Sequence, residues 1–151
     1  MTTFRFRLEQ VLQYRRRQLE LEEAKYQQRM REAAELEAER SRMEAAGIGA
    51  ETQVRAWSPV TGNDLAALAN YRKYAAAQAR QIAARYAEAR QLAEAQQKAM
   101  LEARRHCQLL ERLKERRRAE WQAAADKELE EIAAESHLAR LSLIAGGRRD
   151  A

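Results

Sequence analysis

The sequence contains little of what bends a chain or fills a compact core. Its 151 residues include one proline, five glycines, one cysteine and nine aromatic residues. Leucine, isoleucine and valine together number 23, whereas alanine alone accounts for 32 residues. A compact core needs large side chains and chain breaks, and β-sheets need β-branched residues. The composition therefore excludes a compact β or α/β domain and is typical of long helices and coiled coils.

Long hydrophobic runs are also missing. The longest stretch without a charged residue is the eight residues 56–63, whereas a membrane-spanning helix needs about 20 apolar residues. The N-terminal segment carries arginines and no apolar signal-peptide core. The single Cys107 has no second cysteine for an internal disulfide, which fits a reducing compartment. We therefore expect a cytoplasmic protein.

Positive charge is concentrated in one part of the chain. The net charge is +5, but residues 65–125 alone carry thirteen basic and six acidic groups, and residues 126–151 are net acidic. A basic stretch of this kind is consistent with a solvated helix face, with an acidic protein surface as partner, or with nucleic acid or an anionic membrane.

Two long helical stretches are predicted, over residues 4–46 and 64–143, with a connecting segment at 47–63 and a flexible tail at 144–151. In the second stretch, apolar residues recur every three or four positions, as in a coiled coil. We expect Thr3 and Gly47 to cap the first helix. Either Ser58-Pro59 or Thr61 with Asp64 would start the second. The predicted seam of the second helix is Leu65, Leu68, Ala75, Ala79, Ile82, Tyr86, Ala89, Ala93, Met100, Ala103, Cys107 and Leu110.

The simplest architecture is a single all-α domain, an antiparallel coiled-coil hairpin whose second helix is the longer. If the turn centres near residue 55, residue 4 lies opposite residue 106, and the second helix overhangs over about 107–142. The overhang carries large apolar residues with no intramolecular partner, which predicts an external one.

The sequence offers no arrangement suited to catalysis. No glycine-rich phosphate loop is present, and His106 and Cys107 are neighbours that point about 100° apart on a helix. Many carboxylates have the spacing of intrahelical ion pairs, as in Glu22–Lys25, Glu37–Arg40, Glu94–Lys98 and Glu111–Lys114. We expect a non-enzyme with no catalytic residues, no metal site and no cofactor.

Four segments together resemble a known family. They are the opening residues 4–15, Asn70-Tyr-Arg-Lys-Tyr74, residues 109–121, and residues 127–133, where Glu130-Glu131 replaces the family's Asp-Glu pair. In this order and spacing the chain resembles the flagellar export protein FliJ family over nearly its whole length. The stalk protein of virulence type III secretion systems is similar.

This resemblance implies a cytoplasmic component of the flagellar type III export apparatus, involved in flagellar biogenesis and motility. Family members are two-helix coiled coils similar to the shaft of rotary ATPases. They insert into the hexameric ring of the FliI-type export ATPase, promote its assembly and activity, connect it to the FlhA-type export gate and escort export chaperones. The implied location is the cytoplasmic face of the inner membrane, at the flagellar base.

The resemblance also suggests contact residues. Those expected at the export gate are Leu36, Met43, Tyr71, Tyr74, Gln78 and Gln81. Those expected at the ATPase ring are Phe4, Leu8, Arg112, Arg116, Arg117 and Trp121. The alternatives are a basic coiled-coil protein that binds nucleic acid and a homodimeric scaffold in which two overhangs pair. No nucleic acid is expected for an export stalk.

Overall fold

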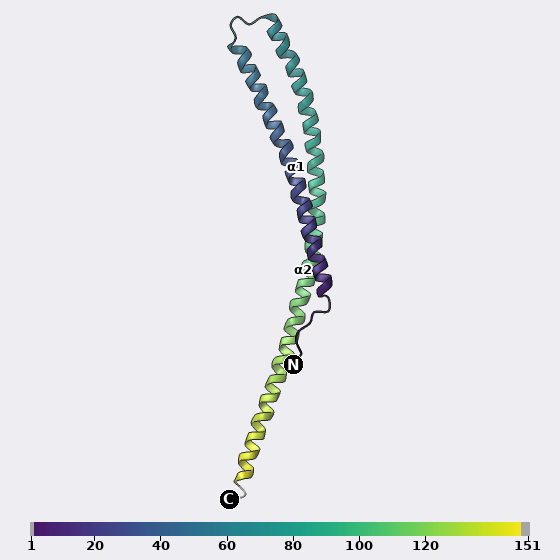
Figure 1. The fold of residues 1–151 in the computed structure, drawn as a ribbon, viewed down its shortest axis with the longest axis vertical. Helices are drawn as coiled ribbons and strands as arrows, with labels where there is room; N and C mark the ends of the chain where they lie inside the picture. The colour runs from purple at the N-terminus through teal and green to yellow at the C-terminus, as the bar shows by residue number, and fades with distance from the viewer. Residues whose placement is uncertain (1, 149–151) are drawn as a thin grey trace. The chain divides into compact units, whose positions relative to one another are not determined.

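The computed structural model describes residues 2–148, which form two long α-helices and no strand. Helix α1 spans Glu9–Ala56 and helix α2 spans Gly62–Gly147, with 48 and 86 residues. The helices pack against each other as a two-helix hairpin, joined by the short connection 57–61 (Figure 1). The predicted all-α hairpin with a longer second helix is confirmed.

The described residues divide into two compact units, each built from both helices. Residues 17–104 form the unit that contains the connection, and residues 2–16 with 105–148 form the unit that contains both ends of the chain. We call them the loop unit and the terminal unit.

The loop unit is held together by a narrow seam of small and medium side chains. Its buried side chains are Ala33, Ile82, Ala89, Ala93 and Met100. Polar groups complete the seam at its edges. Arg72 Nε lies 2.8 Å from Glu51 Oε1, Arg104 Nη2 lies 3.4 Å from Glu23 Oε1, and Gln96 donates to the backbone carbonyl of Glu22 at 3.2 Å and to its carboxylate.

A capping box starts α2. The backbone N–H of Asp64 donates to Thr61 Oγ1 at 3.2 Å, and the backbone N–H of Thr61 donates to Asp64 Oδ2 at 3.0 Å. These reciprocal bonds satisfy two N–H groups that a helix start leaves unpaired, and they lower the pKa of Asp64. Of the two predicted starts, Thr61 with Asp64 is confirmed. Ser58-Pro59 lies in the connection instead.

Helix α1 does not end at Gly47, as predicted, but continues through Gly47 and Gly49 to Ala56. Neither glycine adopts a positive φ, so neither forms the left-handed cap that the prediction assumed. A helical glycine costs only about 1 kcal/mol relative to alanine. The helix continues past them through alanine residues to Glu51, whose carboxylate pairs with Arg72 of α2.

Replacing these glycines should therefore stabilise the hairpin. A Cβ atom added at Gly47 or Gly49 would meet no atom within 4 Å, so Gly47→Ala and Gly49→Ala should each raise the free energy of unfolding by about 0.5–1 kcal/mol. Thermal and urea unfolding followed by circular dichroism would measure this. Unchanged or lowered stability would contradict a helical conformation at these positions.

In the terminal unit, α1 begins at Glu9 rather than at Phe4, and residues 2–8 form a non-helical arm. Burial in the arm repeats every two residues rather than every 3.6, because Phe4 and Phe6 are half-buried while Arg5 and Arg7 are exposed. Alternation of this kind is typical of extended backbone. Thr3 therefore does not cap a helix.

The overhang of α2 begins later than predicted. Cys107 and Ala125 are buried, and Lys114 and Trp121 contact Glu9 and Phe4. Residues 126–148 are all exposed, and α2 remains helical to Gly147, beyond the predicted end at 143. Figure 1 shows this yellow part of α2 extending past the N-terminus. The predicted overhang over 107–142 was wrong for two reasons. The connection centres near residue 59 rather than 55, and the extended arm reaches further along α2 than a helix of the same residues would. The last three residues of the predicted tail, 149–151, lie outside the described residues.

Candidate interaction surfaces

The arm and α2 enclose a pocket in the terminal unit. The ring of Phe4 lies against the indole of Trp121, with centroids 6.0 Å apart and planes tilted by 52°, a favourable geometry for an aromatic pair. The pocket beside them has a volume of about 700 Å³. Its lining residues are Thr2, Thr3, Phe4, Arg5, Phe6, Arg7, Leu8, Leu113, Arg117 and Trp121.

Four of the six residues predicted to contact the ATPase ring line this pocket: Phe4, Leu8, Arg117 and Trp121. The other two, Arg112 and Arg116, are exposed on α2 away from the pocket. The pocket lining contains three arginines and no acidic residue. The structure thus brings aromatic rings and positive charge together at the end of the molecule where the sequence analysis expected a partner.

Sequence reasoning did not identify Phe6, Arg5, Arg7 and Leu113 as parts of this surface. The signal for the first three was present in the alternating Phe-Arg-Phe-Arg run, which fits an extended arm better than a helix. Leu113 was assigned to an unpartnered overhang because the turn was placed too early.

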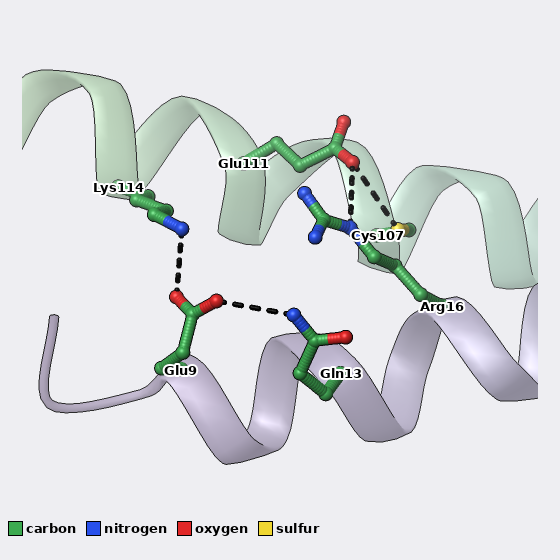
Figure 2. A network of polar contacts seen from close by, with 6 residues as sticks. All are labelled: Glu9, Gln13, Arg16, Cys107, Glu111 and Lys114. Atoms are coloured by element: carbon green, nitrogen blue, oxygen red, sulfur yellow. Dashed lines mark hydrogen bonds and ion pairs between the residues drawn. The ribbon is translucent and has the colours of Figure 1, made fainter.

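A polar network holds α1 and α2 in register beside the pocket (Figure 2). Lys114 Nζ lies 2.8 Å from Glu9 Oε2, and Gln13 Nε2 donates to Glu9 Oε1 at 3.1 Å. The hydrogen bond from Lys114, followed by the one from Gln13, lowers the pKa of Glu9. Lys114 therefore pairs across the helices rather than with Glu111, its predicted partner within α2.

Glu111 also acts between the helices. Its Oε1 lies 3.4 Å from Arg16 Nε and accepts a hydrogen bond from Cys107 Sγ at 3.7 Å. Burial raises the pKa of the Cys107 thiol, and the nearby Glu111 carboxylate acts in the same direction. This thiol is therefore held in its neutral form and fills the seam as a small apolar side chain.

The residues predicted to contact the export gate lie in the loop unit. Leu36, Met43, Tyr71 and Gln78 are half-buried along the seam, whereas Tyr74 and Gln81 are exposed. A shallow recess of about 260 Å³ lies between the helices here, and its lining includes Met43 but none of the other five. The recess lining is Arg40, Met43, Glu44, Gly47, Ala75, Ala76, Ala79 and Ile82.

Neither a clustered metal-binding group nor a membrane-spanning element occurs in the described part of the chain. No set of three or more His, Cys, Asp or Glu side chains gathers within residues 2–148. None of the helical residues in that range forms a stretch apolar enough and long enough to cross a bilayer.

Comparison of the chain with protein-family models, with curated proteins and with solved structures finds no match in any of the three. The surfaces described here are therefore interpreted from their own chemistry.

Loss of the contact between Phe4 and Trp121 should change the tryptophan fluorescence of the protein. In a Trp57→Phe background, Trp121 is the sole tryptophan, and Phe4→Ala should shift its emission to longer wavelength because the indole loses its cover. The loss of the aromatic pair should lower the free energy of unfolding by about 0.5–1.5 kcal/mol. Leu138→Ala, at an exposed position on the overhang, is the matched control. An emission spectrum unchanged by Phe4→Ala would contradict the packing of the arm.

The Glu9–Lys114 pair should make stability depend on pH. The pKa of Glu9 is lower in the folded protein than its ordinary value of 4.5. The carboxylate therefore contributes stability above that ordinary value, and the contribution disappears as pH falls through the lower folded value. We expect Glu9→Gln to lower the melting temperature near pH 7, by an amount that shrinks as the pH falls below 4.5. Melting curves of both proteins over this range would check it, and a pH-independent difference would disagree.

Proposed function

We propose that this chain is a non-enzymatic coiled-coil stalk of the flagellar type III protein export apparatus. In this role it inserts into the ring of a FliI-type export ATPase, promotes ring assembly and activity, connects the ring to an FlhA-type gate, and escorts export chaperones. It acts in the cytoplasm, at the cytoplasmic face of the inner membrane where the flagellum is built.

One observation carries the proposal. Helix α2 continues for 22 residues beyond Ala125, its last buried residue, and each of these residues is exposed. An amphipathic helix that extends this far without an intramolecular partner is suited to entering a partner's cavity. The aromatic and basic pocket at its base supplies a second contact surface. The four motifs that resemble the FliJ family support the same assignment.

The gate-binding role is assigned to the loop unit. Tyr74 and Gln81 are exposed on α2 there, and Met43 lines a recess between the helices. The alternative, a stalk of a virulence type III system, predicts similar surfaces, so identification of the partner would distinguish the two. A nucleic-acid role is disfavoured, because the acidic residues that follow Trp121 on α2 would repel a phosphate backbone.

Charge reversal tests the ring contact. We expect Arg112→Glu combined with Arg116→Glu and Arg117→Glu to abolish stimulation of the organism's own export ATPase, because the surface would change from basic to acidic. The matched control reverses the same number of charges at Arg80, Arg85 and Arg90, which are exposed in the loop unit, and should keep stimulation. ATPase turnover and co-sedimentation with the ring would be measured. If the first variant bound the ATPase ring as well as the native chain does, these arginines would not be ring contacts.

Truncation after Ala125 tests the exposed part of α2 separately. It leaves all the buried residues of the structure in place, so the hairpin should fold with an unchanged melting temperature. Loss of stimulation would locate the essential contact on residues 126–147. Retained stimulation would move it to the pocket. No stimulation by the full-length chain, at any ratio, would overturn the proposed function.

A further inference from the structure

The exposed surface of α2 in the terminal unit carries two blocks of opposite charge. Residues 112–118 contain five basic residues and one acidic residue, a net charge of +4. Residues 126–135 contain five acidic residues and one basic residue, a net charge of −4. We call them the basic block and the acidic block. Most of the basic block and the whole of the acidic block are solvent-exposed.

The two blocks cannot neutralise each other within one molecule. Both lie on the same helix, and their centres are about 15 residues apart, which is roughly 23 Å along the axis. The Debye length at physiological ionic strength is about 8 Å. Each block therefore presents a nearly independent field to solvent.

Ion pairs within α2 neutralise only part of the charge of the two blocks. Glu120 pairs with Arg116 and Arg117, and Lys127 with Glu131, all within one turn of α2. Within residues 2–148, seven further members of the blocks make no ion pair: Arg112, Glu115, Arg118, Asp126, Glu128, Glu130 and Glu135. Charges left exposed in two separate blocks favour a partner that carries both signs at the same spacing.

We propose that this partner is a second copy of the chain, docked antiparallel along α2. A two-fold axis near residue 123 would place the basic block of each copy beside the acidic block of the other. The contact would then form twice, as in an isologous dimer. A parallel pair would instead place like charges side by side. Residues 123 and 124, which lie between the blocks, are exposed alanines, so the two backbones can approach closely.

Apolar side chains reinforce this register. Leu129 and Ile132 in the acidic block are 53% and 52% exposed. With the axis near residue 123, Ile132 of one copy lies opposite position 114 of the other, one residue from Leu113. Leu113 lines the pocket that Phe4, Leu8 and Trp121 also line. The antiparallel dimer therefore brings the exposed leucine and isoleucine close to the apolar side chains that line this pocket, beside the basic block.

The proposal does not rest on the proposed function, although the dimer would cover the same arginines and exposed helix. Self-pairing and insertion into a ring would then compete for one surface. The dimer can be tested with the purified chain alone, so its failure leaves the stalk assignment untouched.

Sedimentation velocity of the full chain would test the dimer at concentrations up to about 100 μM. We expect a monomer–dimer equilibrium whose dissociation constant rises on the order of tenfold between low salt and about 0.5 M salt, since screening weakens charge pairing between exposed groups. A monomer at all concentrations in low salt would overturn the proposal.

Charge swapping gives the sharper result. The basic-block variant combines Arg116→Glu, Arg117→Glu and Arg118→Glu, and the acidic-block variant combines Glu128→Lys, Glu130→Lys and Glu131→Lys. Each alone should be monomeric, because both contacts of its homodimer become repulsive. An equimolar mixture should form a heterodimer, since both of its contacts pair opposite charges. Circular dichroism of each variant verifies that the helices form.

Two outcomes of the swap would contradict the antiparallel register. One is a basic-block variant that dimerises as well as the native chain, which would indicate pairing through residues 126–147 alone. The other is a mixture that stays monomeric although both variants are helical and the native chain dimerises. The control variant reversed at Arg80, Arg85 and Arg90 in the loop unit should dimerise like the native chain.

Cysteine cross-linking locates the axis independently. Single substitutions Gln122→Cys, Ala123→Cys and Ala124→Cys place a thiol close to its symmetry mate, and at least one should form an intermolecular disulfide under mild oxidation. Cys107 is buried and should remain reduced in the native chain. Efficient cross-linking at Ala139→Cys but at none of the three would place the axis elsewhere and refute the register.

Discussion

The structure depends on a single narrow row of contacts between two helices. The buried side chains among the described residues are Leu12, Ala33, Ile82, Ala89, Ala93, Met100, Cys107 and Ala125. Half of them are alanine, so the helices approach closely but bury little apolar area at each layer. A seam of this kind favours a hairpin without specifying its register strongly. A shift of one helix along the other brings an alanine to the position of another alanine, and the packing changes little. The remaining specificity has to come from groups beside the seam.

Charged and amide side chains supply that specificity. Glu9 with Lys114 and Glu51 with Arg72 are both 2.8 Å pairs, one in each unit. In each pair the residue numbers sum to the same value, so both units use one antiparallel register. Individual exposed pairs contribute roughly 0–1 kcal/mol, yet a shift by one turn would break all of them together. The same charges keep the flanks of each helix pair hydrated.

The sequence predicted the features that depend on periodicity. Ile82, Ala89, Ala93, Met100 and Cys107 were assigned to the seam and are buried, because helical spacing alone identifies one face of α2. Leu65 was assigned to the same seam but is exposed, since it lies in the first turn, where α1 offers less cover. Features that depend on where the chain reverses were not predictable. The later connection and the extended arm together moved the overhang and made Trp121 the partner of Phe4. Composition also could not show that Lys114 and Glu111 reach across the helices.

The position of the chain reversal also determines which charges remain for other molecules. The arm that precedes α1 lies beside Leu113 and Trp121. It covers one flank of the basic block and leaves the acidic block exposed. If α1 reached further along α2, its own charges would pair with both blocks. Helix α2 would then expose neither a basic nor an acidic segment to solvent. If α1 ended earlier, Leu113 and Trp121 would lie in water. With the observed length of α1, the exposed surface of α2 carries one basic block, one acidic block and a few large apolar side chains. Such a surface favours long helical partners of matching charge pattern over flat or uniformly charged ones.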